Sequence, residues 1–575
     1  MEKNLEQLSL SADIPVAAST DDSANEAAGA TANDEVSKLQ KRKKKKSKSK
    51  SCSSLGALAK NNSALPSQKC MEGRFPWKIV VKSGRGRCAI ATRDIKAGEV
   101  IVSECALAFV LRSSFRTIAC HNCCKDFSKE STSIQCRVCN YSLFCQECWE
   151  STRELHQECC SVIKLIGDIA VEEDCDKDLL RLMLFLALQR HSTMNETKDT
   201  VGIRGGIRGD ILYSSFQDAM ALQTHENKVS ESWRLSVARA CERLAEHATN
   251  EITNFQNSKG DLEYLACLIN ANAHGMGAQG IHNTDIAIGI FPFVSMLNHS
   301  CRPNCCFYSE GNVMHVRATK DITKNSELCL SYINLYEARG TRKEQLAVSK
   351  HFDCACSRCT EPLTSSVDRF LEGVLCNVKG CNGVLVKQPQ SFANASTEQP
   401  AGLWQCDTCL GILDPTICIS QGQAKSLDER PWDTLNNAQT RLSAAISVYK
   451  ERRFKEARKQ LEDFLSEFTG KLHPLHVLLF DALTPLMNCC RVLGDAEGGV
   501  KACRTIIDCM EKVLSGPSLE LANFYFCLGE MYSERADSVE SSAILAKRYK
   551  KQAQEAFNHV RQLRRICLEK ATLSL

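Results

Sequence analysis

The sequence predicts an α+β protein of several units, in which a β-rich fold is split by a cysteine-rich segment and a helical insert. Three observations support this class. Short β-prone runs occur within residues 77–102 and again within 286–332, and a helical pattern fills most of 161–272 between them. Cysteines gather in C-x2-C pairs. From about residue 432 onward the pattern is helical, and the 575-residue chain is too long for one ordinary domain.

The first 72 residues are rich in small and polar residues and poor in large apolar ones, so we expect a disordered tail. Its run Lys41–Lys50 holds eight positive charges, although the formal net charge of the whole chain is only +4. A compact basic run in an accessible tail favours nuclear import, and a solvated tail that contacts RNA or anionic surfaces is the alternative. The rest of the chain is mildly acidic, so nucleic-acid binding beyond the tail is not expected. The expected localisation is the nucleus and the cytoplasm.

Composition argues against membrane insertion and secretion. No apolar run approaches the roughly 20 residues that span a bilayer, and the N-terminus has early charges and no apolar core. The 34 cysteines therefore do not suggest the disulfide framework of a small secreted protein. In a large chain without a signal peptide, clustered C-x2-C pairs indicate zinc ligands.

The first β-rich part is predicted at residues 73–119. Its runs Trp77–Val81 and Cys88–Thr92 flank a glycine-containing turn at residues 83–86, and Gly98 marks a turn before a third run. The second β-rich part is predicted at 263–333, with strands at residues 286–290, 304–308, 313–318 and 327–332.

The cysteine-rich segment 120–160 offers eight ligands, which is enough for two tetrahedral zinc ions. In such compact modules, two ligand pairs that follow one another in the sequence rarely bind the same ion. We therefore expect each zinc to be bound by every second pair. One zinc would be held by Cys120, Cys123, Cys145 and Cys148, and the other by Cys136, Cys139, His156 and Cys160. Cys159 competes with Cys160 for the last position. Because so short a segment has little core of its own, the metals would supply its folding free energy.

Two more ligand sets follow the second β-rich part. Cys354, Cys356 and Cys359 offer three ligands within six residues, and Cys301 is the candidate for the fourth. A separate zinc ribbon is predicted at 370–412 from Cys376, Cys381, Cys406 and Cys409. The spacing of this last set is looser, so unmetallated cysteines are the alternative.

The remaining segments are predicted to be helical. Residues 161–262 form a helical insert with a flexible loop at Gly202–Gly209. Residues 430–575 contain helices of about 15 residues, among which RFKEARKQLEDFL and DAEGGVKACRTII resemble the second helices of helix-turn-helix units. The units start at Arg453 and Asp495, a spacing longer than the tetratricopeptide period of about 34 residues. We therefore expect a tetratricopeptide-like α-helical domain, with an irregular helical bundle as the alternative.

The sharpest motif is Asn298-His299-Ser300-Cys301-Arg302-Pro303-Asn304-Cys305, followed by the segment Glu327–Tyr332 and preceded by Gly84-Arg85-Gly86. This arrangement resembles the SET methyltransferase fold. With the cysteine-rich finger inserted between the glycines and the motif, residues 74–360 resemble a SET and MYND domain lysine methyltransferase. The resemblance makes 73–119 and 263–333 the two parts of a SET domain, 120–160 a MYND zinc finger and 334–362 a post-SET zinc segment. The helical C-terminal domain also fits the family, and the ribbon is known from part of it.

The resemblance implies an S-adenosylmethionine-dependent protein-lysine N-methyltransferase that acts on histone or non-histone proteins by direct in-line displacement. Tyr332 would be the catalytic residue at the methyl-transfer centre, Asn272 would hold the amino-acid end of the cofactor, and Phe352 would stack on its adenine. Every zinc would be structural, because the chemistry needs no metal. The residues implied in cofactor binding are Ser83, Gly84, Arg85, Gly86, Tyr264, Asn272, Asn298, His299, Tyr332 and Phe352.

A binding module is the rival hypothesis. In it, a SET-shaped scaffold with weak or no catalysis would recruit protein partners through the MYND finger and the helical domain. The sequence keeps the cofactor and tyrosine positions, which favours the enzyme. The expected partners are a protein that carries the substrate lysine and proteins that bind the finger, and no membrane partner is expected.

Overall fold

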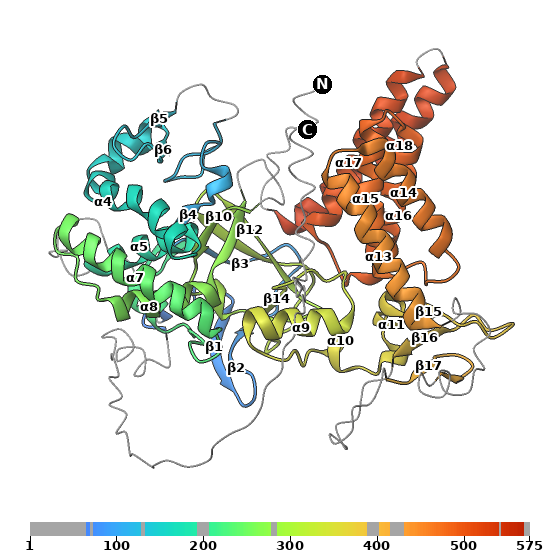
Figure 1. Ribbon diagram of the computed structural model, residues 1–575, viewed down its shortest axis with the longest axis horizontal. Coiled ribbons are helices and arrows are strands. Elements are labelled where there is room, and N and C mark those ends of the chain that lie inside the picture. The colour runs from blue at the N-terminus through green and yellow to red at the C-terminus, as the bar shows by residue number, and fades with distance from the viewer. Residues whose placement is uncertain are drawn as a thin grey trace, which may run out of the picture.

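The computed structural model describes residues 65–68, 73–127, 133–192, 206–277, 285–387, 402–413, 430–539 and 542–568. The basic run Lys41–Lys50 and most of the expected disordered tail lie outside these ranges. At residues 65–68 the expectation of disorder is wrong, because Leu65 is buried in the main core and the amide and hydroxyl of Ser67 donate to the carboxylate of Asp218 at 2.9 and 2.7 Å. Figure 1 shows a mixed part of helices and small sheets beside a bundle of long C-terminal helices, with a small sheet at the foot of that bundle. No helix in the described ranges is long and apolar enough to cross a membrane.

The β-rich part is built from several small sheets rather than one large one. Strand β3 lies in the middle of a five-stranded sheet of order β12-β13-β3-β8-β7, and a three-stranded sheet has the order β4-β10-β9. Strands β1 and β2 form a separate antiparallel hairpin. The strands are β1 (Trp77–Lys82), β2 (Gly86–Ala91), β3 (Val100–Cys105), β4 (Ala108–Leu111), β7 (Gly206–Arg208), β8 (Ile211–Tyr213), β9 (His274–Gly277), β10 (Asp285–Ile290), β12 (Cys305–Glu310) and β13 (Val313–Ala318).

Most of the predicted strands are present, but two segments differ. The segment 327–332 contributes only the two-residue strand β14 (Cys329–Leu330). The predicted flexible loop at Gly202–Gly209 is wrong for its described end, because residues 206–208 form β7 and pair with β8. The physical reason is a tight hairpin: Gly209 adopts a φ of +59°, and β-branched isoleucines flank the turn.

The helical insert surrounds one side of the sheets. It consists of α4 (Gln146–Glu172), α5 (Lys177–Ser192), α6 (Phe216–Met220), α7 (Glu231–Glu251) and α8 (Lys259–Asn272). The predicted boundary at residue 160 falls inside α4. The first half of this helix carries ligands of the finger, whereas Ile163, Ile166 and Ile169 in its second half are buried in the main core. Their spacing places these side chains on one face of the helix.

The C-terminal domain is a row of helices. They are α13 (Pro431–Lys450), α14 (Phe454–Phe468), α15 (Val477–Val492), α16 (Ala496–Val513), α17 (Leu519–Ser538) and α18 (Ala543–Cys567). Each helix packs against the next one in the chain, as expected for a tetratricopeptide-like array. Gly529 allows the close approach of α17 and α18, because a Cβ there would meet the ring of Phe557 at 2.6 Å. The sequence prediction of a helical C-terminal region is confirmed.

Hydrogen bonds and a ring stack attach this domain to the β-rich part. The guanidinium of Arg317 in β13 donates from Nε to the carbonyl of Ile566, near the end of α18, at 3.0 Å. The hydroxyl of Tyr336 donates to the carbonyl of Leu475 at 3.1 Å, and its ring stacks on Phe480 with 3.7 Å between centroids. The helical domain is therefore fixed against the chain that follows the segment 327–332.

Candidate active site and its zinc sites

The motif at residues 298–305 and the segment 327–332 lie side by side. Strand β11 (Asn298–His299) pairs in parallel with β14. Just after it, the amide of Ser300 donates to the carbonyl of Leu330 at 2.9 Å. The side chain of Asn304 then accepts from the amide of Cys329 at 2.8 Å and donates to the carbonyl of Glu327 at 2.9 Å. Backbone and side-chain hydrogen bonds thus hold residues 298–304 against 327–332.

Tyr332 lies at the end of this pairing. Its hydroxyl donates to the carbonyl of Leu297 at 2.5 Å, and its amide donates to Nδ1 of His299 at 3.1 Å. Burial raises the pKa of Tyr332 above its ordinary value, and the nearby Cys329 and Glu327 add to this effect. The phenol is therefore neutral at physiological pH. Because its proton is directed at Leu297, its oxygen lone pairs remain available to accept hydrogen bonds.

The ring of His299 lies between two other predicted site residues. Its centroid is 5.4 Å from that of Tyr332 and 6.2 Å from that of Phe352. Its Nε2 lies 3.2 Å from the Sγ of Cys301. Burial lowers the pKa of His299 to about 4, so the imidazole is neutral. The structure thus brings Tyr332, His299, Phe352 and Cys301 together.

Asn298 joins the motif to the glycine-containing turn. Its amide donates to the carbonyl of Arg87 at 2.9 Å and to Oε1 of Glu327 at 3.0 Å, and the same carboxylate pairs with Arg85 at 3.3 Å. Ser83, at the start of the turn, is exposed. Gly84 and Gly86 have φ values of +72° and +69°, and no other atom lies within 4 Å of where a Cβ would be. The turn therefore requires glycine and leaves open space for a ligand.

Asn272 and Tyr264 both lie on α8, at different depths. Asn272 ends the helix, and its amide donates to the carbonyls of Gln223 and Leu268 at 2.7 and 2.8 Å. The neighbouring carbonyl of residue 271 accepts from Lys350 at 3.2 Å, which joins the end of α8 to the segment just before residue 352. Tyr264 is 8% exposed and packs in the main core. Its role in cofactor binding stays a prediction.

The eight ligands of the finger form two clusters with the alternating pairing that the spacing predicts. In each cluster the ligand atoms lie within 4.8 Å of one another. Cys159 is excluded from the second cluster, because its Sγ donates to the carbonyls of Leu155 and His156 instead. The clusters are Cys120, Cys123, Cys145 and Cys148, and Cys136, Cys139, His156 and Cys160.

The other two predicted ligand sets also converge, and four thiols within such a distance fit a tetrahedral zinc ion. In the first, the Sγ of Cys301 lies 3.5 Å from that of Cys359, and the amide of Cys301 donates to the Sγ of Cys356 at 3.4 Å. The second stands on the four-stranded sheet β15 (Val374–Leu375), β16 (Val384–Lys387), β17 (Trp404–Cys406) and β18 (Ile412–Leu413). The sets are Cys301, Cys354, Cys356 and Cys359, and Cys376, Cys381, Cys406 and Cys409.

Comparison with known proteins identifies this arrangement. A family model described as the SET domain matches residues 86–333. Residues 86–333 therefore form a SET domain. A SET and MYND domain-containing protein of Dictyostelium discoideum is 24% identical over 371 residues, which cover 58% of this chain and 95% of that protein. This relative and the two finger clusters support a likeness to SET and MYND domain proteins.

Two other relatives are named for an activity. A protein of Arabidopsis thaliana named histone-lysine N-methyltransferase ASHR1 is 28% identical over 316 residues, which cover 53% of this chain and 60% of that protein. Human histone-lysine N-methyltransferase SMYD1 is 25% identical over 365 residues, with coverages of 59% and 68%. A solved SET domain of LSMT bound to lysine and AdoHcy aligns with 80% of this chain and 92% of its own, at 12% identity. Its TM-score of 0.27 is too low to support a structural argument.

Sequence reasoning missed a buried carboxylate that supports the SET site. Glu104 of β3 is fully buried and accepts from the amides of Phe293 and Val294 at 3.1 and 2.8 Å. Burial raises the pKa of Glu104 to about 8, although these hydrogen bonds oppose the shift. The bonded amides open the turn Val294–Met296, which leads directly to Leu297. Glu104 thereby helps to position the carbonyl that accepts from the Tyr332 hydroxyl.

A second buried carboxylate supports the post-SET cluster. Asp368 pairs with Arg342 and with Arg358 at 2.7 Å each, and the guanidinium of Arg342 also donates to the Sγ of Cys359 at 3.9 Å. Burial disfavours the ionised form of Asp368, but the arginines outweigh it, so its pKa lies below the ordinary value. Arg342 places positive charge beside thiols that a zinc ion would bind as thiolates.

We expect Asp368→Asn to destabilise the protein by about 3–5 kcal/mol, because it leaves buried arginines without their common anion. Chemical denaturation of the zinc-loaded chain measures this. Asp321→Asn is the matched control, since that carboxylate pairs with Lys96 on the surface and should leave the unfolding midpoint unchanged. Equal midpoints for the two variants would contradict the structural role of Asp368.

Zinc should be stoichiometric. Native mass spectrometry should give about four zinc ions per chain, since each of the four clusters offers one complete tetrahedral ligand set. A count of three ions would mean that the ribbon set, whose Cys409 is exposed, does not bind zinc. A chain that folds without any metal would overturn the zinc assignment.

Proposed function

We propose that the protein transfers methyl groups from S-adenosylmethionine to the side-chain amine of lysine in a protein substrate, histone or non-histone. The observation that carries this proposal is the placement of Tyr332, whose neutral phenol is anchored on the Leu297 carbonyl at the point where the two motif segments meet. Relatives that are named lysine methyltransferases over the same region support it.

The residues around this point fit the cofactor. The open space beside Gly84 and Gly86 allows the backbone to approach a ligand closely. Phe352 offers an aromatic face for a purine, and Asn272 has an amide at the end of α8 for the amino-acid end. When bound, S-adenosylmethionine supplies a methyl group activated by its sulfonium.

The protein would contribute mainly by positioning. The Tyr332 oxygen can accept from an N–H of the substrate amine and make weak C–H···O contacts with the methyl group. The amine must be neutral to attack, and a desolvated position near a cation favours the neutral form. A phenol with a raised pKa does not act as a base at neutral pH, so Tyr332 would orient the amine rather than deprotonate it.

The protein partners of the MYND finger are a second part of the proposal. Val138 and Leu155 on the finger are large apolar side chains that are 63% and 67% exposed. They offer a surface on which a partner could bury apolar area. A scaffold with weak or no catalysis would recruit partners through the finger and the helical C-terminal domain.

Calorimetry with S-adenosylmethionine, combined with a labelled-methyl screen on nuclear and cytosolic proteins, separates these functions. An enzyme binds the cofactor and labels a protein that contains lysine. If the zinc-loaded protein binds no S-adenosylmethionine at millimolar concentration, the catalytic proposal fails and only the fold and the partner surface remain.

We also propose a nuclear and cytoplasmic protein whose nuclear share depends on Lys41–Lys50. Deletion of this run in a fluorescent fusion should lower the nuclear share, because its eight positive charges form the import candidate. An unchanged nuclear share would contradict this.

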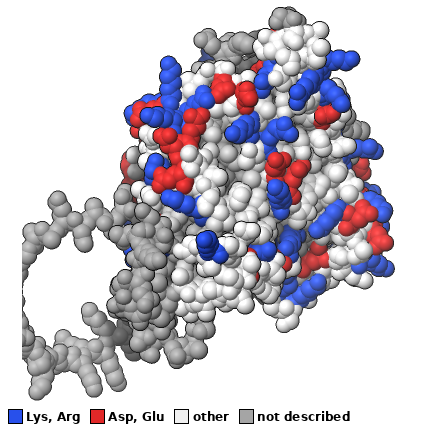
Figure 2. All heavy atoms as spheres, turned by 90° about the vertical axis from the view of Figure 1, so that its right-hand side faces the viewer, with Lys and Arg blue, Asp and Glu red and all other residues white. Residues whose placement is uncertain are grey.

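The protein that lacks Lys41–Lys50 should bind DNA weakly, because basic and acidic side chains are interspersed on the face shown in Figure 2. Strong salt-dependent binding would contradict that expectation.

A further inference from the structure

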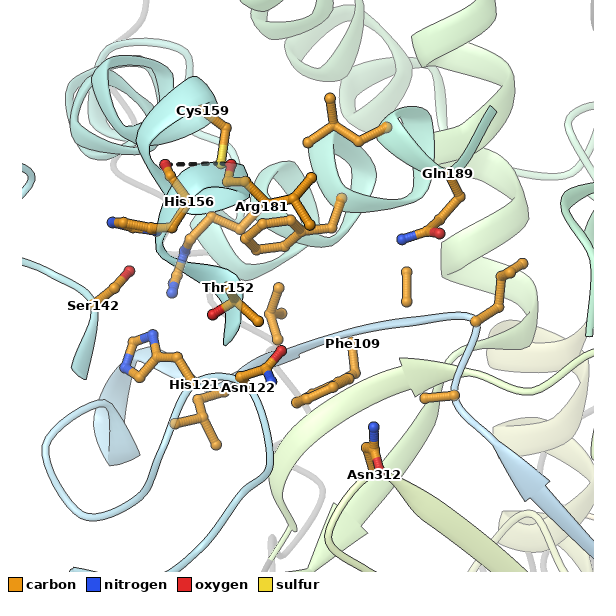
Figure 3. A pocket seen from close by; sticks show the side chains of 18 of the residues that line it. Phe109, His121, Asn122, Ser142, Thr152, His156, Cys159, Arg181, Gln189 and Asn312 are labelled. Carbon is orange, nitrogen blue, oxygen red and sulfur yellow. Dashed lines mark hydrogen bonds between the residues drawn. The ribbon is translucent and has the colours of Figure 1, made fainter. Parts of the chain in front are cut away.

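A cavity of about 520 Å³ lies between the MYND finger and the SET core. Its walls come from the finger, from helices α4 and α5, from strand β4 and from the β7–β8 hairpin, and none of the predicted cofactor residues lines it (Figure 3). Its volume falls within the range of small-molecule sites, which often form between domains.

The middle of the cavity is apolar. Phe109 comes from β4, Phe185 and Leu188 from α5, and Ile163 from α4. Figure 3 shows Phe109 extending into the space between the helices and the strand. A ligand with an apolar body could cover these side chains and remove them from water.

The finger end of the cavity is polar and is dominated by Arg181. This residue is 4% exposed, and its guanidinium lies 4.4 Å from the ring centroid of Tyr141. Figure 3 shows the side chain of Arg181 reaching from its helix toward His121, Ser142 and Thr152. The Tyr141 hydroxyl is buried and has no hydrogen-bond partner among the described residues, so a ligand oxygen could bond to it.

The charges around this end favour an anion. None of the described residues that line the cavity is an aspartate or a glutamate. Arg116 places a second guanidinium 5.5 Å from the Tyr141 ring, whereas Asp178 is the one carboxylate that pairs with Arg181 among the described residues. Burial, and then Arg116, lower the pKa of Arg181 to about 10, because both disfavour its charged form.

We propose that this cavity binds an anionic amphiphile, with its carboxylate at Arg181 and Tyr141 and its apolar body along Phe109, Phe185 and Leu188. The proposal is independent of methyl transfer, since the site shares no residue with the predicted cofactor site. A cationic amphiphile would add positive charge beside two guanidiniums that share one carboxylate, and a neutral one would not balance their excess charge.

Dodecanoate and dodecyltrimethylammonium test the class of ligand, because their alkyl chains have equal length and their head groups have opposite charge. Calorimetry on the zinc-loaded full chain, below the micelle concentrations, should give one dodecanoate per chain and at least about tenfold weaker binding of the cation. Equal affinities, or many equivalent dodecanoate molecules per chain, would overturn the proposal.

Two variants locate the site. Leu188→Trp should fill the cavity and lower dodecanoate affinity by about tenfold or more. Val171→Trp is the control, because Val171 is an apolar residue that is 84% exposed and lies outside the cavity. This variant should leave dodecanoate affinity unchanged. Arg181→Gln should also weaken dodecanoate binding about tenfold, and Arg239→Gln on α7 is its control. If Arg181→Gln does not fold, the tryptophan pair decides: unchanged dodecanoate affinity in folded Leu188→Trp would refute the site.

Discussion

Replacement of Tyr332 by phenylalanine should reduce methyl transfer by about 10²-fold or more, because it removes one oriented contact at the reaction centre. The ring and its packing remain, so stability and S-adenosylmethionine affinity should change little. The lost group is the hydroxyl that donates to the Leu297 carbonyl and whose lone pairs would orient the substrate amine. Single-turnover kinetics with labelled cofactor, beside calorimetry of cofactor binding, measure both effects.

Phe352→Ala is the companion variant. It should weaken cofactor binding first, because it removes the face on which adenine would stack. An enzyme would lose transfer in both variants, through turnover in one and through affinity in the other. If Tyr332→Phe keeps the activity of the wild-type protein, the role assigned to Tyr332 is wrong. If the wild-type protein transfers no methyl group and neither variant changes the binding of protein partners, the scaffold hypothesis is supported.

Cys301→Ser should have the largest effect on stability. Cys301 belongs to the post-SET cluster, and its Sγ also lies 3.2 Å from Nε2 of His299 in the motif. Loss of this ligand should release one zinc ion, lower the free energy of unfolding by more than about 4 kcal/mol and weaken cofactor binding with it. Native mass spectrometry, chemical denaturation and calorimetry follow the three effects.

Cys409→Ser is the matched control in the ribbon. It removes one thiol from a complete set of four, as Cys301→Ser does, but that set stands on a separate small sheet. Its zinc should be lost while cofactor binding persists. If Cys409→Ser impairs cofactor binding as much as Cys301→Ser, the special position of Cys301 is wrong.

The zinc ligands could be predicted from sequence because their chemistry is local. Pairs such as Cys120 and Cys123 are close whatever the rest of the chain does, and the four pairs of the finger can be combined two by two in only three ways. The choice of Cys160 over Cys159 was left open, since both are near the required spacing. On a helix, adjacent residues point in different directions, and α4 turns Cys159 away from the cluster.

Other parts of the site had no signal in the sequence. The acceptor for the Tyr332 hydroxyl is a backbone carbonyl, and every residue has one. Glu104 is far from the motif in the chain, and only the folded sheet brings it to the turn before Leu297. The role of Glu327 was similarly hidden, because its partners Asn298 and Arg85 come from two distant segments.

Helix α4 determines how the finger should be isolated. A fragment that stops at residue 160 ends in the middle of this helix and leaves its last bound ligand at a frayed terminus. A fragment extended to Glu172 keeps the helix whole, but it exposes Ile163, Ile166 and Ile169, which the intact protein buries. The shorter fragment would therefore lose metal, and the longer fragment would bind apolar surfaces nonspecifically. Searches for partners of the finger should therefore use the complete chain, with exposed positions such as Val138 changed one at a time.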